Sequence, residues 1–138
     1  MLAARNEHIK KTLLQAKKDK KVVISDRFTD STYAYQVIGN KINQNLNIAN
    51  KNYILKDLKP NLTIVLKSNL NSIFLRLKKR KNKNKFDELD QHFYIKAQNA
   101  FIKIAKRNKK SYVIFDSSVN DNSLERKILD ITLKKLNY

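Results

Sequence analysis

The sequence contains no cysteine and no tryptophan, and it has only one glycine and one proline. Without cysteine, the chain can form neither a disulfide nor a thiolate metal site. The single glycine, Gly39, excludes the loops G-x-x-x-x-G-K-[ST] and G-x-G-x-x-G, so these residues encode no glycine-rich phosphate cradle. The only two histidines, His8 and His92, are isolated. We assign them no chemistry and expect no metal site.

Acidic residues are also scarce, with 12 Asp and Glu against 30 Lys and Arg and a formal net charge of +18. Such a charge is compatible with a polyanion partner such as nucleic acid. The basic residues are mostly lysine, however, and they are spread through every segment together with asparagine and isoleucine. These three residue types share A- and T-rich codons, so genome composition is the simpler explanation. We therefore do not expect a nucleic-acid partner.

Long apolar runs are absent too. No run approaches the roughly 18 residues of a membrane span, and the first residues, MLAARNEHIKK, lack the charged-then-apolar order of a signal peptide. We expect a soluble, cytoplasmic protein without a membrane partner. A chain of 138 residues is long enough for one domain with its own core.

Short apolar, β-branched runs alternate with segments of helical period, which predicts an α/β fold with a parallel sheet. Strands are expected over 22–24, 62–66 and 112–115. Asp26, Lys67 and Asp116 would then lie at the carboxyl ends of the strands, where sites in such sheets form. Helices are expected over 9–16, from Asp30 or Ser31 as N-cap to 39, over 48–58, from Ser68 or Asn69 as N-cap to 77, from about 87 to 107, and around 124–131. The first helix would carry Ile9, Leu13 and Ala16 on one apolar stripe. The stripe of the long helix would be Leu89, Phe93, Ala97, Ala100, Phe101 and Ile104.

The stretch VVISDRFTDSTYAYQ, residues 22–36, carries the most specific signal. An Asp-Arg pair follows an expected strand, and an aromatic residue, a Ser-Thr pair and A-Y-Q come after it. This order closely resembles the motif of the thymidylate kinase family. Other segments match further family motifs: AARNEH, LKPNLTIVL, FYIKAQNAFIKIAK and FDSS, with KKRKNKNKFDE in the place of the lid.

The resemblance implies a P-loop NTPase-like parallel sheet with flanking helices. Residues 1–138 would form a partial nucleoside monophosphate kinase domain with a mobile lid at about 78–87. The domain would be incomplete, because the first two strands and the phosphate loop have no counterpart here. The implied activity moves the γ-phosphoryl group of ATP onto dTMP to give dTDP for dTTP biosynthesis. ATP and Mg²⁺ are implied cofactors, with the Mg²⁺ ligands mostly outside these residues, and this chain alone is expected to be inactive. A homodimer is implied when the protein is full length, with the first helix and the helix from Asp30 at the dimer face.

The resemblance also implies a dTMP site. Arg27 would grip the phosphate, a task that suits a forked and permanently charged guanidinium, and Asp26 would orient Arg27 or the sugar. Arg5 would reach thymine, and Tyr35, beside the deoxyribose, would disfavour a 2′-hydroxyl. The matching dTMP-binding positions are Arg5, Asp26, Arg27, Thr32, Tyr35 and Gln36.

Two further groups follow from the resemblance. In the lid, Arg80 and Lys85 fall on catalytic positions, and Lys85 keeps the charge of the usual arginine but loses its fork. Ser117 and Ser118 fall in the adenine region. Arg76 has two open interpretations, a structural one and a phosphate-facing one.

The sequence also departs from the family pattern. Lys67 replaces an acidic residue at the end of the second expected strand, and Asn61 replaces an aspartate. Taken alone, an Asp-Arg pair such as Asp26-Arg27 is often a surface ion pair worth less than about 1 kcal/mol. The alternatives are therefore a related deoxynucleotide kinase, or a basic, non-catalytic nucleic-acid-binding remnant.

Overall fold

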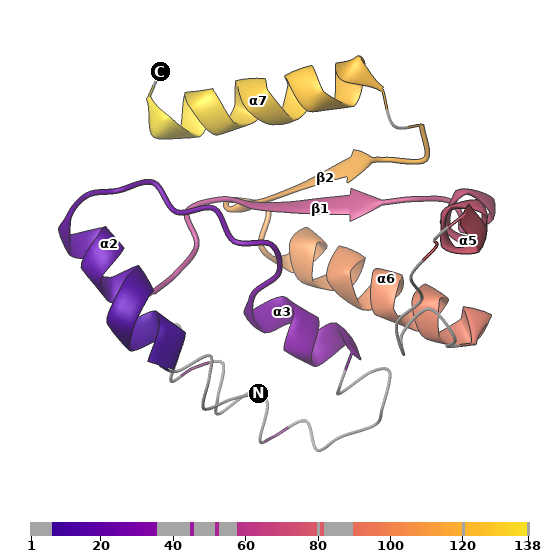
Figure 1. Cartoon of the computed structure of the whole chain (residues 1–138), viewed down its shortest axis with the longest axis horizontal. Helices are drawn as coiled ribbons and strands as arrows, with labels where there is room; N and C mark the ends of the chain where they lie inside the picture. The colour runs from indigo at the N-terminus through magenta and orange to yellow at the C-terminus, as the bar shows by residue number, and fades with distance from the viewer. Residues whose placement is uncertain are drawn as a thin grey trace.

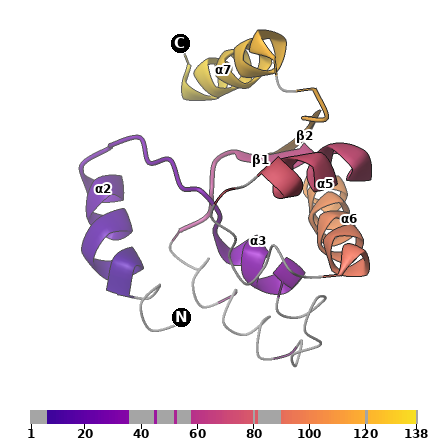
Figure 2. The same cartoon turned by 45° about the vertical axis from the view of Figure 1, so that its right-hand side comes forward.

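The computed structural model describes residues 7–35, 45, 52, 58–79, 81, 90–119 and 121–137. Its centre is a parallel sheet of two strands, β1 (Thr63–Lys67) and β2 (Tyr112–Asp116). Figure 1 and Figure 2 show helix α7 (Asn122–Leu136) on one side of this sheet and helices α3 (Thr29–Thr32) and α6 (Gln91–Arg107) on the other side. Helix α5 (Leu70–Lys79) follows the carboxyl end of β1 (Figure 1). The α/β class predicted from the sequence is confirmed.

The two strands form from β-branched and aromatic residues, which fit a pleated, covered surface. Their register pairs Thr63 with Tyr112 at one end and Lys67 with Asp116 at the other. Just beyond the sheet, the Ser117 N–H donates to the Lys67 carbonyl over 2.7 Å. The strands predicted at 62–66 and 112–115 are confirmed to within one residue, and their carboxyl ends lie side by side.

The helices after the strands begin at polar caps. The Asn69 side chain accepts from the Ser72 N–H over 2.8 Å at the start of α5. Asp121 does the same for the Ser123 and Leu124 N–H groups, at 3.0 and 3.1 Å, at the start of α7. Each cap satisfies backbone donors that have no partner inside the helix. The predicted cap at Asn69 is confirmed.

Helix α6 supplies most of the packing beneath the sheet. Its buried residues are Phe93, Ala97, Ala100 and Ala105, and the first three belong to the predicted apolar stripe. Within the ranges described, no helix has both the length and the apolar character needed to cross a bilayer.

The amino-terminal part forms a second small core. A π-helical turn, η1 (Ile9–Leu13), leads into α2 (Leu14–Lys18). Ile9 and Leu13 are buried, and Leu14, Phe28 and Leu58 pack against them. The stripe predicted for the first helix is therefore confirmed, and its apolar face is covered within the chain.

Helix α3 differs from the expectation at its start. It begins at Thr29, after Phe28, whose side chain makes no capping hydrogen bond. The predicted caps Asp30 and Ser31 are wrong, since both residues lie inside the helix. The expected continuation from 36 to 39 and the helix expected over 48–58 fall outside the described residues, apart from Asn52 and Leu58.

The strand expected over 22–24 is wrong. This segment has no strand structure, and Val22, Val23 and Ile24 are 62%, 47% and 90% exposed. A strand needs a neighbour to bond its backbone N–H and C=O groups. In the part of the chain that the structure describes, the only strands are β1 and β2, which pair with each other. Asp26 consequently follows an unpaired segment, and only Lys67 and Asp116 lie at strand ends.

Helix α7 carries a buried leucine and an exposed one, which together test how this helix packs on the rest of the chain. Leu124 is 7% exposed and Leu129 on the same helix is 54% exposed. We expect Leu124→Ala to lower the free energy of unfolding by about 2 kcal/mol or more, and Leu129→Ala by less than about 0.5 kcal/mol. Urea unfolding followed by circular dichroism measures both, and equal losses would contradict this burial pattern.

Candidate functional site

The structure brings two of the predicted dTMP-binding residues into contact. The Arg27 guanidinium carbon lies 5.1 Å from the centre of the Tyr35 ring, within range of a cation–π interaction. Arg27 is exposed on the bend before α3, and Tyr35 is half-buried further along the helical segment that α3 begins. The contact holds the guanidinium at the surface, where its N–H groups can reach an anion.

The backbone at Arg27 contributes to this placement. Arg27 has a φ of 66°, in the left-handed region that costs a non-glycine residue about 1–3 kcal/mol. The Ser25 hydroxyl donates to the Arg27 carbonyl over 3.0 Å and closes the bend. Strained backbone of this kind persists only where surrounding contacts support it, and it occurs often at ligand sites.

Tyr35 is itself held by aromatic contacts from α6. Its ring stacks on Phe93 at 5.7 Å between centroids and meets the edge of Phe101 at 5.9 Å. These geometries are the favourable ones for aromatic pairs. The ring therefore has a fixed position, and Arg27 packs on a rigid surface.

The neighbouring predicted residues differ in exposure. Thr32 is only 6% exposed, so its side chain lies in the interior beneath α3. Asp26 is exposed, and among the described residues it forms no ion pair with Arg27. Arg5 and Gln36, together with the lid residues Arg80 and Lys85, lie outside the described residues.

A second group of polar residues lies at the carboxyl ends of the strands. The Lys67 ammonium and the Asp116 carboxylate are 3.2 Å apart across the sheet. Hydrogen bonds from Ser118, through its hydroxyl and its N–H, together with Lys67, lower the pKa of Asp116 to about 2. The unexpected lysine at position 67 thus has a carboxylate partner, which stays ionised down to low pH.

Ser117 and Ser118 have different roles in this group. Ser117 is 7% exposed, and its N–H and hydroxyl both donate to the Lys67 carbonyl, at 2.7 and 3.1 Å. The Ser118 hydroxyl accepts from the Asn69 N–H over 2.9 Å. Ser117 therefore supports the strand end, and Ser118 connects it to the first turn of α5.

Arg76 also stabilises the segment that follows β2. Its guanidinium donates to the Ser117 carbonyl over 2.5 Å and approaches the Ser118 carbonyl at 3.4 Å. Of the two interpretations open for Arg76, these contacts favour the structural one. Nearby, the buried hydroxyl of Ser68 has no hydrogen-bond partner in the described part of the chain.

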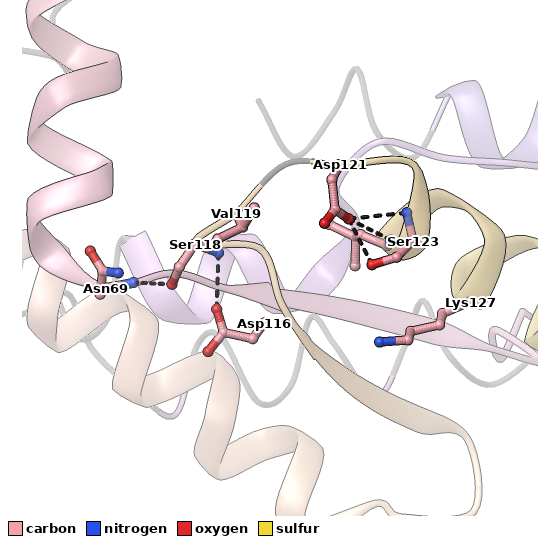
Figure 3. Close-up of a pocket in the computed structure, with 8 residues that line it drawn as sticks. Asn69, Asp116, Ser118, Val119, Asp121, Ser123 and Lys127 are labelled. Atoms are coloured by element: carbon pink, nitrogen blue, oxygen red, sulfur yellow. Dashed lines mark hydrogen bonds between the residues drawn. The ribbon is translucent and has the colours of Figure 1, made fainter.

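A cavity of about 450 Å³ opens beside these residues (Figure 3). Hydrogen bonds from the Ser123 hydroxyl and the Leu124 N–H lower the pKa of Asp121, which caps α7 at its rim. Figure 3 shows Asp116 at the end of β2, Ser118 and Asp121 on the loop between β2 and α7, and Lys127 on that helix. The lining residues are Asn69, Asp116, Ser118, Val119, Asp121, Ser123, Leu124 and Lys127.

Several lining residues were missed in the sequence. Asn69 was predicted as a helix cap but not as a lining residue, and Asp121 could have been found as a cap in the same way. Lys127 and Val119 carry no comparable signal. Metal donors do not gather here, since no group of three or more His, Asp or Glu side chains forms within the described ranges.

Comparisons with known proteins agree with this architecture. Residues 1–128 match the family model described as Thymidylate kinase. The chain is 39% identical over 126 residues to the thymidylate kinase of Ehrlichia ruminantium (strain Gardel), with 89% of this chain and 60% of the relative covered. It is 33% identical over 132 residues to that of Wolbachia pipientis wMel, with 94% and 65% covered.

A solved structure gives the same result. The crystal structure of thymidylate kinase from Ehrlichia chaffeensis superposes with a TM-score of 0.70 at 25% identity, covering 95% of this chain and 62% of the other. The chain therefore spans about three-fifths of the length of the proteins it matches. With a family model that covers nearly all of its residues, the chain belongs to the thymidylate kinase family.

Proposed function

We propose that the protein is a dTMP kinase, which transfers the γ-phosphoryl group of ATP to dTMP and yields dTDP. Family membership supports the reaction class, and this chain spans about three-fifths of the matched relatives, so the activity proposed is that of the whole protein. The observation that carries the proposal for this chain is the contact between Arg27 and Tyr35.

Arg27 would bind the dTMP phosphate. A guanidinium offers two parallel N–H donors to one phosphate, and Arg27 is exposed while its position is fixed by the Tyr35 ring and the bend at Ser25. Tyr35 would lie beside the deoxyribose. Because its ring packs against Phe93 and Phe101, it would not move aside to make room for a 2′-hydroxyl, which disfavours ribonucleotides.

The cavity beside Ser118 would take the adenosine part of the phosphate donor. It is open, mixed in polarity and located at the carboxyl ends of parallel strands, which is where nucleotides bind in such folds. Ser118 lines it directly, whereas Ser117 acts through the Lys67 carbonyl.

The remaining roles stay predictions. Phosphoryl transfer depends on positioning and on cations around the migrating group, which is the role we expect for Arg80 and Lys85 in the lid. Mg²⁺ would supply further charge, but the described residues offer it no cluster of carboxylates. Asp116 is committed to Lys67 and Ser118.

We also propose a cytoplasmic location, in keeping with the lack of cysteine. A homodimer remains a proposal. The buried positions of Ile9 and Leu13 leave the polar face of the first helix for such a contact.

The dTMP site can be tested by calorimetric titration of the 138-residue chain. We expect dTMP to bind more tightly than thymidine, because only dTMP carries the phosphate. Arg27→Gln should weaken dTMP binding about 10- to 100-fold, the effect of losing hydrogen bonds to a charged group. Arg107→Gln, at the exposed end of α6, is the matched control and should bind like the wild type.

Equal affinity for dTMP and thymidine, or an unchanged Arg27→Gln variant, would contradict the proposal. Tighter binding of dUMP, dCMP or AMP would instead identify a related nucleotide kinase. Salt-dependent binding to random DNA without nucleotide binding would identify a nucleic-acid-binding remnant.

The adenosine site can be tested by fluorescence, because the chain has no tryptophan of its own. Val119 lines the cavity, and Leu129 is exposed on α7 outside the set of lining residues. We expect ATP to quench the emission of Val119→Trp in a saturable way, because the indole can stack on adenine, and to leave Leu129→Trp unchanged. Ribose 5-triphosphate should quench neither variant, and an equal response of both to ATP would refute the assignment.

A further inference from the structure

A hydrogen bond joins the sheet to the segment that carries Arg27. The Tyr112 hydroxyl donates to an Asp30 carboxylate oxygen over 2.6 Å in a partly buried place. Tyr112 is the first residue of β2, and Asp30 lies in the first turn of α3. The bond spans 82 residues of sequence.

The hydrogen bond between Tyr112 and Asp30 is maintained at neutral pH. Burial, followed by the hydrogen bond and charge of Asp30, raises the pKa of Tyr112 above its ordinary value of 10.0, and a hydrogen bond with Thr63 acts in the opposite direction. Thr63 is the register partner of Tyr112 on β1. The phenol therefore keeps its proton, and a donor is always present for the carboxylate.

Tertiary contacts fix the start of helix α3, among them the packing of Phe28 against Ile9 and Leu13. The helix is four residues long, and its N-cap residue, Phe28, makes no side-chain capping bond. Helices this short are not stable on their own and depend on tertiary contacts. Further along the segment, Tyr35 packs between Phe93 and Phe101. The near end, three residues after Arg27, is where Asp30 meets Tyr112.

We propose that Asp30 and Tyr112 are positioning residues for the phosphate-binding Arg27, because their hydrogen bond fixes the start of α3 to the edge of the sheet. The inference rests on the proposed dTMP site and deepens it. In this role neither residue would need to touch the substrate. They act by keeping Arg27 over the Tyr35 ring and maintaining the conformation that binds.

The test compares Tyr112→Phe, which keeps the ring and removes the donor, with Tyr33→Phe, which removes a hydroxyl from the α3 segment itself. We expect Tyr112→Phe to weaken dTMP binding about tenfold through a smaller population of the binding conformation. Tyr33→Phe should bind like the wild type. Asp30→Asn keeps an acceptor oxygen and should retain most of the affinity that Asp30→Ala loses.

Hydrogen exchange supplies a readout that does not require dTMP. The amides of residues 29–35 should lose protection in Tyr112→Phe and Asp30→Ala, whereas those of β1 and α6 should keep it. If protection falls uniformly, the pair is merely structural and the inference is overturned. If the wild type binds dTMP and Tyr112→Phe binds it equally, the inference fails while the proposed function stands. If the wild type binds no dTMP, the proposed function fails, and a selective loss in α3 still supports the positioning of Arg27.

The pH dependence of stability provides a second signature. A folded-state pKa raised above 10.0 means that the unfolded chain releases the Tyr112 proton first as pH rises. The stability that the pair supplies is thus present below pH 10 and is lost above it. Asp30 on α3 is the charged group that contacts Tyr112 among the described residues. We expect the difference in unfolding free energy between the wild type and Tyr112→Phe to shrink from pH 9.5 to 11, and a constant difference would overturn the assignment.

Discussion

The parallel pairing of β1 and β2 is the contact on which both groups of site residues depend. Its register sets Lys67 beside Asp116 at one end and Thr63 beside Tyr112 at the other. The first end carries the cavity, and the second end holds α3 through Asp30. A slip of one residue would exchange the two faces of a strand. It would separate Ser117 from the Lys67 carbonyl, and it would also separate Tyr112 from Asp30.

The sequence predicted correctly those elements whose signals lie within the element itself. Strands β1 and β2 could be predicted because β-branched runs end at polar residues, and α5 because Asn69 caps it. The segment 22–24 has the same composition and was predicted wrongly, since the neighbour that a strand needs is not a local property. The start of α3 was missed for a similar reason. Asp30 has the chemistry of a cap, but its carboxylate is bonded to Tyr112, which is distant in sequence.

The candidate site shows the same division. The family motif led to Arg27, Tyr35 and Ser118, and the structure gives their contacts within the chain, while their roles toward a nucleotide stay predictions. It could not reveal that Thr32 is buried, that Lys67 pairs with Asp116, or that Val119 and Lys127 line a cavity. These features arise only when segments far apart in sequence meet. Arg5, Gln36, Arg80 and Lys85 stay predictions, because they lie outside the described residues.

The exposed segment 22–24 also affects the colloidal behaviour of the chain. An exposed, apolar and β-branched segment that pairs with no strand among the described residues is a template for pairing with another molecule. Lys20 and Lys21 precede it, and the net charge of +18 makes molecules repel one another. Salt screens that repulsion over about 8 Å at physiological ionic strength. The same lysines that suggest a polyanion partner therefore act as protection against self-association, and that protection weakens as ionic strength rises.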